Sequence, residues 1–366
     1  MTTMMTAKVS CAAAPTSTTL RRSAAAPLRS ASVAPLRRAA SSSSLRCAAG
    51  GADGDKMVVA ITGATGFVGK KLVETLMAEG HEVRILTRDS LAARLALPQA
   101  TLGGAKFYTH DTLSGAIEWY TAVKGCTGVV NLAGAPISDP WNEDYKKTLV
   151  KSRLTTTNRL ADAINAIPED ERPSLVSSSA VGYYGISTRD TFDEKSRAGK
   201  DFLANLCVQW EKAAMAAQTP ATTIIRTGVV LEAGGGALGK ILPIFQLFTG
   251  GPLGSGKQFV SWIHRDDLVA LIIAALKRPY TYAGVVNGTA PVTTTMTGLC
   301  EAVAKSTNRP NWLPVPGFAL KLILGEGATV VLDGQKVLPK RTESLGFQFQ
   351  YPTVEEAVEA IVNGGS

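Results

Sequence analysis

Apolar and polar positions follow two recurring patterns from residue 57 onwards. Short runs of Val, Ile and Leu without polar alternation are typical of strands buried on both faces. Stretches with an apolar residue every three or four positions are typical of amphipathic helices. The runs predict strands at residues 58–61, 82–87, 106–109, 128–132, 174–179 and 222–227, and the helical spacing predicts helices at 68–79, 91–97, 142–166 and 202–214. Strands that alternate with helices predict an α/β fold with a doubly wound parallel sheet.

Beyond residue 230 this alternation ends. Residues 232–257 are rich in glycine around an apolar middle. The chain then predicts a helix at 268–276, a strand at 285–287, a helix at about 294–305 and, in the tail, an apolar stretch at 320–332 and an amphipathic helix at 354–361. We therefore predict one large α/β domain over residues 57–288 and a small mixed C-terminal domain, on the substrate side, over residues 310–362.

The first 48 residues have a different composition from the rest. They are rich in Ala, Ser, Thr and Arg and contain no Asp or Glu. This composition is typical of an organelle transit peptide, so residues 1–48 are excluded from the fold prediction. The heavy Ser/Thr content, and the sequence Leu45-Arg46-Cys47-Ala48-Ala49, favour a chloroplast address. A mitochondrial address is the alternative.

Charge and cysteine usage narrow the classes of partner. The net charge is +8, but residues 1–50 carry seven Lys or Arg, which leaves +1 for the remainder. A nearly neutral folded part favours neither a nucleic-acid nor a membrane partner, and no apolar run is long enough for a transmembrane segment. The five cysteines and three histidines lack metal-ligand spacing, so we predict no metal site and interpret Cys126, Cys207 and Cys300 as buried free thiols.

The clearest chemical signal is a glycine motif between the first strand and the first helix. Gly63, Gly66 and Gly69 stand three residues apart, with an apolar strand before them and a helix after them. At such a turn the free N–H groups of the helix start and the helix dipole attract a pyrophosphate. The context predicts dinucleotide binding rather than a purely structural turn. We assign the cofactor contacts of this turn to Gly63, Thr65, Gly66, Phe67 and Val68.

The second strand ends at Thr87-Arg88, where the cofactor's adenosine ribose is expected. Enzymes that use NAD(H) usually place an acid here, whereas an arginine accommodates a 2′-phosphate. Arg88 therefore predicts NADP(H), and the alternative is an exposed arginine at a strand end. Asp111, which ends the third strand, is a candidate for the adenine amino group or a simple turn residue.

Two further strand ends carry small or polar residues. Asn131 is followed by Leu132, Ala133 and Gly134, which would let a cofactor ribose lie against the backbone. The fifth strand ends at Ser179, and Tyr183 and Tyr184 follow it, at the sheet edge where open α/β proteins bind ligands. A hydroxyl and a phenol beside a nicotinamide could exchange protons with a substrate. The alternative is that the tyrosines only pack in the loop.

A second glycine motif resembles a phosphate-binding loop but lacks its context. Residues 251–257 fit G-x-x-x-x-G-K, yet Lys257 is followed by Gln258 instead of the Ser or Thr that would hold Mg²⁺. The next residues are β-branched or aromatic and predict no helix. We therefore reject an ATP site.

Taken together, these motifs resemble an extended short-chain dehydrogenase/reductase of the epimerase type. More closely, they resemble the atypical SulA-like epimerase family, whose plant members are called Giant Chloroplast. The matching stretches are 131–134, 141–143, 151–153, 182–184, 226–230, 235–239, 250–256, 262–267 and 332–341. The resemblance implies a Rossmann domain that binds NADP(H), with Thr87, Arg88, Leu132, Ala133, Arg153 and Val229 at cofactor positions.

The sequence departs from catalytic reductases at one place. Those enzymes carry Tyr-x-x-x-Lys early in the helix after the fifth strand; counting back from Glu211, these positions fall on Leu203 and Cys207. Two hypotheses follow. One is an NADP(H)-dependent epimerase or reductase that acts on a small molecule, with Ser179 and Tyr183 or Tyr184 at the catalytic site. The other is a non-catalytic NADP(H)-binding regulatory protein with a protein partner, for which the resemblance suggests plastid division.

Overall fold

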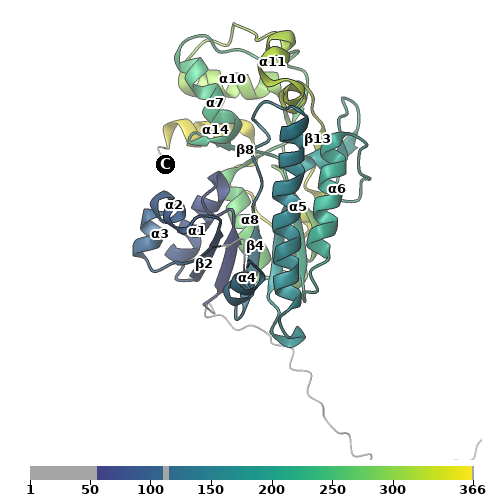
Figure 1. The fold of residues 1–366 in the computed structure, drawn as a ribbon. Coiled ribbons are helices and arrows are strands. Elements are labelled where there is room, and N and C mark those ends of the chain that lie inside the picture. Colours follow the sequence, from purple (N-terminus) through teal and green to yellow (C-terminus); the bar gives the residue numbers. More distant parts are fainter. Residues whose placement is uncertain (1–55, 110–114, 365–366) are drawn as a thin grey trace, which may run out of the picture. The chain divides into compact units, whose positions relative to one another are not determined.

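The computed structural model describes residues 56–109 and 115–364, which contain a seven-stranded sheet (Figure 1). All neighbouring strands in the sheet are parallel, in the order β11-β7-β5-β4-β1-β2-β3. The strands are β1 (Val58–Thr62), β2 (Glu82–Thr87), β3 (Lys106–Thr109), β4 (Gly128–Asn131), β5 (Ser174–Ala180), β7 (Thr222–Thr227) and β11 (Gly284–Gly288). The predicted doubly wound sheet is confirmed, and the predicted strand bounds agree with the structure to within one residue.

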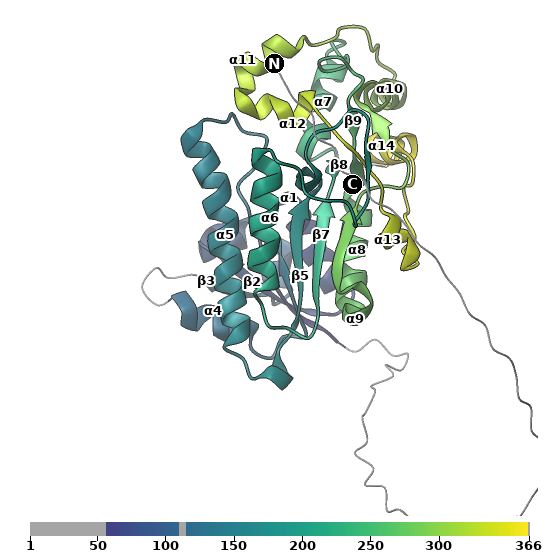
Figure 2. The same ribbon diagram turned by 90° about the vertical axis from the view of Figure 1, so that its right-hand side faces the viewer.

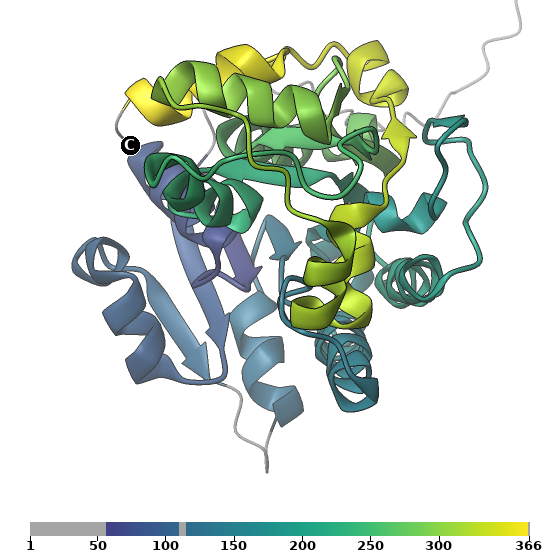
Figure 3. The ribbon, with the colours of Figure 1, turned by 90° about the horizontal axis from the view of Figure 1, so that it is seen from above.

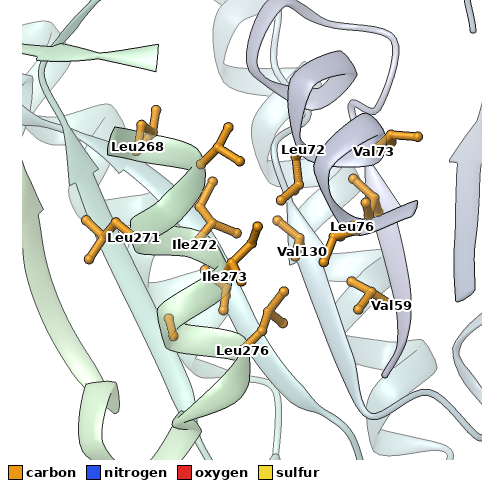
Figure 4. Close-up of a cluster of buried hydrophobic side chains, with 14 of the residues drawn as sticks. Val59, Leu72, Val73, Leu76, Val130, Leu268, Leu271, Ile272, Ile273 and Leu276 are labelled. Carbon is orange, nitrogen blue, oxygen red and sulfur yellow. The ribbon is translucent and has the colours of Figure 1, made fainter. Parts of the chain in front are cut away.

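Helices cover both faces of the sheet. Helices α1 (Phe67–Ala78) and α8 (Arg265–Lys277) pack on one face, and α4 (Gly115–Val123), α5 (Glu143–Asn165) and α6 (Phe202–Met215) pack on the other (Figure 2). Successive strand residues serve opposite cores: Val59 and Ile61 belong to the cluster under α1 and α8, and Ala60 to the cluster under α5. Figure 4 shows the first cluster, where Leu72 and Leu76 of α1 lie near Val130.

The apolar segment after residue 230 contains a helix of its own. Strand β8 (Val229–Glu232) leads into α7 (Gly236–Gln246). The elements around α7 are β9 (Phe259–Val260), β10 (Trp262–His264), β12 (Thr294–Thr295), α10 (Met296–Thr307) and α14 (Val354–Asn363). Leu231, Phe245, Trp262 and Val358 belong to one buried core among these elements. Because β8 follows directly from the end of β7, this second core lies over the carboxyl ends of the strands (Figure 3).

The tail returns to the edge of the large sheet, where the Thr342 hydroxyl donates to the carbonyl oxygen of Asn287 in β11 at 2.8 Å. Strand β13 (Lys336–Val337) pairs with β6 (Thr191–Phe192), and Asp267 accepts hydrogen bonds from the N–H groups of Gln350 (2.8 Å) and Tyr351 (3.0 Å). The remaining elements are α2 (Ser90–Ala96), α3 (Pro98–Leu102), η1 (Glu169–Glu171), η2 (Val181–Tyr184), α9 (Pro279–Tyr282), α11 (Gly317–Leu324), η3 (Glu326–Ala328), α12 (Thr329–Leu332) and α13 (Lys340–Ser344). The division at residues 288 and 310 stays a prediction.

Some sequence predictions fall outside the described residues, namely the transit peptide at 1–48 and the adenine contact at Asp111. Within 56–109 and 115–364, no helix is both long enough and apolar enough to cross a membrane. The same ranges contain no group of three His, Cys, Asp or Glu side chains placed to hold a metal ion. Cys126, Cys207 and Cys300 are buried free thiols.

Candidate functional site

The glycine motif forms the tight junction that the sequence predicts. Gly63 has φ of +72°, and a Cβ there would lie 2.7 Å from the carbonyl carbon of Leu132 and 2.9 Å from the nitrogen of Ala133. A Cβ on Gly69 would lie 2.3 Å from the carbonyl oxygen of Gly63. The ends of β1 and β4 and the start of α1 are therefore in contact, which only glycine permits at these two positions.

The start of α1 offers its N–H groups without competition from a capping side chain. Gly66 is the N-cap residue and has no side chain, and the first turn of α1 carries no acid. Phe67 and Val68, which open the helix, are half-buried. Helix α7 begins nearby in the same way, with Gly235 as its N-cap and no acid in its first turn. Free N–H groups and the positive ends of helix dipoles favour an anion at this place.

The end of β4 is held by a buried hydrogen-bond network. Asn131, fully buried, accepts a hydrogen bond from the Thr62 hydroxyl at 2.7 Å and donates to Thr157 at 2.8 Å and to Ser177 at 3.2 Å. The indole N–H of Trp210 also donates to Thr157, at 3.0 Å. The network connects β1, β4, β5, α5 and α6. It therefore holds the end of β4 in place, and with it the start of residues 132–134.

Arg153 reaches from α5 to the loop after β4. Its guanidinium donates to the carbonyl oxygens of Ala135 (3.1 Å) and Leu149 (3.2 Å) and lies 5.1 Å from the centre of the Trp210 ring. A Cβ on Gly134 would lie 3.0 Å from the Arg153 guanidinium carbon. Burial lowers the pKa of Arg153, and no carboxylate of the described chain pairs with it. Arg153 is therefore a half-buried cation beside the predicted cofactor loop.

Arg88 is exposed just beyond the end of β2. The neighbouring acid, Asp89, caps α2 by accepting from the N–H of Ala92 at 2.9 Å, and the Thr87 hydroxyl accepts from the N–H of Asp89 at 3.2 Å. None of the ion pairs within 56–109 and 115–364 includes Arg88. Among the described residues its guanidinium therefore has no carboxylate partner and can receive an anionic group.

Ser179 belongs to a buried charged network. Its hydroxyl donates to Glu211 of α6 at 2.6 Å, and Arg226 of β7 donates two hydrogen bonds to the same carboxylate, each at 2.8 Å. The side chains of Arg226 and Glu211 are only 4% and 12% exposed. Burial alone would lower the pKa of Arg226, but the bonds to Glu211 raise it. Ser179 is thus fixed by an ion pair in the observed structure.

The two tyrosines after β5 have different surroundings. The buried hydroxyl of Tyr184 donates to Asn287 at 2.6 Å and accepts from Arg226 at 3.1 Å. Burial raises the pKa of Tyr184 to about 12, although Arg226 acts in the opposite direction. Tyr183 is half-buried, and the Arg226 guanidinium lies over its ring, 3.3 Å from the centre. The sequence did not distinguish the two residues, but only Tyr184 is built into the interior.

This difference predicts unequal effects of two matched substitutions on stability. Tyr184→Phe removes the hydroxyl that donates to the fully buried Asn287, and an unsatisfied buried acceptor costs about 1–3 kcal/mol. Tyr183→Phe removes a hydroxyl that makes no hydrogen bond within the described residues, so its unfolding free energy should change by less than about 0.5 kcal/mol. Urea unfolding of both variants measures the difference. Equal losses would contradict the assigned roles.

Leu203 and Cys207, which stand at the positions of the missing Tyr-x-x-x-Lys pair, both lie on α6. Leu203, near the start of α6, packs against Gly182, and a Cβ on Gly182 would lie 3.2 Å from the Leu203 Cβ. The Cys207 thiol lies 3.7 Å from the carbonyl oxygen of Ala180, and burial raises its pKa to about 11. Both positions therefore border the end of β5, and neither side chain can replace the tyrosine or the lysine.

Several residues of this region were not predicted as part of the site. They are Thr157, Trp210, Glu211, Arg226 and Asn287. A signal existed for Arg226, because it is a charged residue within a strand that is otherwise suited to the interior. Val229, by contrast, was predicted and lies at the start of β8, where its N–H donates to Ser261 at 2.7 Å.

The second glycine motif has a packing role in the structure. A Cβ on Gly251 would lie 2.2 Å from the carbonyl oxygen of Leu313, and one on Gly254 would lie 2.6 Å from the Leu332 side chain. The residues after Lys257 form β9 rather than a helix. The glycines let the tail approach this turn closely.

Two cavities lie away from the predicted site residues. One, of about 400 Å³, lies between the turn at Gly254 and helices α11 and α12. The other, of about 660 Å³, is an open groove between α1 and α8. Neither is lined by a residue of the predicted cofactor or catalytic set.

Comparison with known proteins agrees with this arrangement. Residues 59–287 match the NAD dependent epimerase/dehydratase family, and residues 315–361 match a domain of unknown function, DUF1731. An Arabidopsis thaliana protein named "Epimerase family protein SDR39U1 homolog, chloroplastic" is 49% identical over 309 residues, which span 84% of this chain and 87% of that protein.

Solved structures give the same result. One is the crystal structure of human epimerase family protein SDR39U1 (isoform 2) with NADPH, whose sequence is 35% identical and whose TM-score is 0.74. The alignment covers 84% of this chain and 99% of the human chain. A nucleoside-diphosphate sugar epimerase from Corynebacterium glutamicum is 28% identical, with a TM-score of 0.66, over 84% of this chain and 58% of that chain. The glycine junction, the seven-stranded parallel sheet and these matches place the chain in the NAD-dependent epimerase/dehydratase family, within the short-chain dehydrogenase/reductase superfamily.

Proposed function

We propose that the chain binds NADP(H) along the carboxyl ends of β1, β2 and β4 and is an epimerase or reductase-like protein. The observation that carries the proposal is the contact of Gly63 with the backbone of Leu132 and Ala133 beside an uncapped helix start. The human relative was crystallised with NADPH. The proposed cofactor residues are Gly63, Thr65, Gly66, Phe67, Val68, Thr87, Arg88, Leu132, Ala133, Gly134, Arg153 and Val229.

Each part of this set suits one part of the cofactor. The N–H groups at the start of α1 suit the pyrophosphate. The exposed guanidinium of Arg88 suits the 2′-phosphate that distinguishes NADP(H) from NAD(H). Arg153 and the backbone of residues 132–134 suit a ribose. When bound, the nicotinamide supplies hydride transfer; the protein's part is to hold it and to place a proton donor near it.

Arg88→Ala tests the cofactor assignment. Removing one charge-assisted contact should weaken NADPH binding about tenfold to a hundredfold, because such hydrogen bonds contribute about 1.5–3 kcal/mol. NADH lacks the phosphate, so its affinity should change less than about twofold. Calorimetric titration of both cofactors measures the two effects. The matched control is Arg94→Ala on α2, whose guanidinium lies over the Phe107 ring and should leave both affinities unchanged. An equal loss for NADPH and NADH would contradict the role of Arg88.

For catalysis, we propose Ser179 and Tyr183, with Tyr184 as the less suitable donor. The half-buried Tyr183 carries a hydroxyl without a hydrogen-bond partner among the described residues, whereas the Tyr184 hydroxyl already has two. Ser179 lies just beyond the end of β4, because β5 pairs Ser177 with Asn131. Tyr183→Phe should then abolish any substrate-dependent oxidation of NADPH while NADPH binding persists.

A second candidate is a cofactor-binding regulatory protein without turnover. Leu203 and Cys207 at the positions of the catalytic pair favour it, as does the ion pair that holds Ser179. This protein would bind NADPH and act through a protein partner, with plastid division as the process suggested by the sequence resemblance. Two assays separate the candidates. Mixing the NADPH complex with carbonyl compounds tests for a reductase by loss of NADPH absorbance, and mixing the NADP⁺ complex with sugar nucleotides tests for an epimerase by analysis of the sugar product, because epimerisation leaves the cofactor unchanged overall. Turnover in either assay requires an enzyme, and turnover in neither favours the regulatory protein.

We also propose a chloroplast location, with the mitochondrion as the alternative. The composition of residues 1–48 supports it, as does the name of the Arabidopsis relative. A fluorescent protein carrying residues 1–48 at its N-terminus should enter chloroplasts. Entry into mitochondria alone would contradict the assignment.

A further inference from the structure

The turn between β8 and α7 lies directly on the first residue of α1. Leu231 and Glu232 form antiparallel bridges with Gly236 and Gly235, which makes residues 231–236 a tight hairpin. A Cβ on Gly235 would lie 2.7 Å from Cδ2 and 3.0 Å from Cε2 of Phe67. The Phe67 ring therefore rests on glycine backbone, and it could not occupy this position beside any larger residue.

The hairpin is anchored to the rest of the fold. Glu232 forms an ion pair with Arg265, the first residue of α8, at 2.7 Å, and their side chains are only 4% and 16% exposed. The Arg265 guanidinium also lies 5.9 Å from the centre of the Phe67 ring. Leu231 and Leu238 on either side of the hairpin are completely buried. Because both ends are fixed, a displaced Phe67 ring cannot be accommodated by a simple outward movement of the hairpin.

We propose that the hairpin at 231–236 holds the Phe67 ring in place and so positions the first turn of α1 for the cofactor's pyrophosphate. Phe67 is the first residue of that turn. A shift of its ring would therefore also move the backbone that carries its N–H group. A first turn whose N–H donors are already held in position binds an anion more tightly, because no ordering of that turn has to accompany binding. The inference rests on the proposed binding of NADP(H) and adds Gly235 as a positioning residue.

Two neighbouring glycines provide a matched test in the full chain. Gly235 has φ of −179°, which any residue adopts, so Gly235→Ala adds a methyl group against the Phe67 ring without straining the backbone. At Gly234 a Cβ would meet no described atom within 4 Å. By calorimetry, Gly235→Ala should weaken NADPH binding about tenfold, and Gly234→Ala less than about twofold, where tenfold corresponds to about 1.4 kcal/mol.

Phe67→Ala shows whether the effect passes through the ring. The single variant should also weaken NADPH binding, and in its background Gly235→Ala should add less than about a twofold further loss. An undiminished effect of Gly235→Ala in that background would overturn the inference, as would equal affinities of the Gly234→Ala and Gly235→Ala variants. If the unmodified chain fails to bind NADPH, the proposed function itself is contradicted, so the two failures are distinguishable. Circular dichroism of each variant checks that the fold is retained.

Discussion

Gly69→Ala is expected to weaken NADPH binding by about a hundredfold or more. The new Cβ would lie 2.3 Å from the carbonyl oxygen of Gly63 and 2.7 Å from the Cα of Ala64, both backbone atoms that cannot rotate away. Helix α1 must therefore shift from the end of β1, and its N–H groups leave the place where a pyrophosphate would be held. Hydrogen bonds to a charged group contribute about 1.5–3 kcal/mol each, so losing two of them at the pyrophosphate corresponds to about a hundredfold or more.

Calorimetric titration with NADPH measures this loss, and Lys70→Ala is the control. Lys70 is the next residue of α1 and is exposed, so its replacement should leave the affinity within about twofold. Thermal unfolding of the Gly69→Ala variant should show a folded protein with a lowered midpoint, since packing of α1 against the sheet is disturbed. A Gly69→Ala variant that binds NADPH like the unmodified protein would contradict the assignment of the glycine junction as the cofactor site.

The second large effect is expected from Arg226→Leu, which breaks the buried ion pair. The substitution leaves the Glu211 carboxylate, with a side chain 12% exposed, without its two hydrogen bonds from the guanidinium. It also removes the donor that bonds Tyr184 at 3.1 Å. Removing one partner of a buried ion pair costs about 3–5 kcal/mol, most of which comes from the charge left unpaired. Urea unfolding should show a loss of that size.

Two further variants make this test specific. Replacing both partners, as Arg226→Leu with Glu211→Leu, should recover part of the loss, because no charge remains unpaired in the interior. Lys147→Ala breaks an ion pair with Asp144 in which the lysine side chain is 77% exposed and the aspartate side chain 90% exposed. It should change the unfolding free energy by less than about 0.5 kcal/mol. A loss below about 1 kcal/mol for Arg226→Leu would contradict the structural role of the network.

The sequence predicted the sheet well because its signals are local. Unalternated apolar runs mark strands buried on both faces, and the caps of α5 at Asn142 and Ala166 are the residues at which the predicted helix begins and ends. Helix α4 was missed, because Gly115–Val123 is short and contains aromatic and β-branched residues with modest helix propensity.

The chemistry of the site was predictable only in part. The glycine junction is determined by residues close together in the sequence. The network around Arg226 joins Ser179, Tyr184, Glu211 and Asn287, which are up to 108 positions apart along the chain. No local spacing encodes such a contact, so the sequence could not show that Ser179 and Tyr184 are engaged by buried partners while Tyr183 is not.

The arrangement of the tail was also beyond local reasoning. Asn287 bonds Tyr184 through its side-chain oxygen, and its side-chain nitrogen donates to the carbonyl oxygen of Leu338 at 2.9 Å. Its backbone oxygen accepts from the Thr342 hydroxyl at 2.8 Å. One buried asparagine therefore connects the tail to the loop after β5. The amphipathic pattern predicted helix α14, but not this connection.

The most direct test of the account is calorimetric titration of the unmodified protein with NADPH and with NADH. The glycine junction predicts that both bind, and the exposed guanidinium of Arg88 predicts that NADPH binds at least about tenfold more tightly. That result would support NADP(H) as the cofactor of this family member. Equal affinity would contradict the preference assigned to Arg88, and absence of binding to either cofactor would contradict the central claim that the carboxyl edge of this sheet is a dinucleotide site.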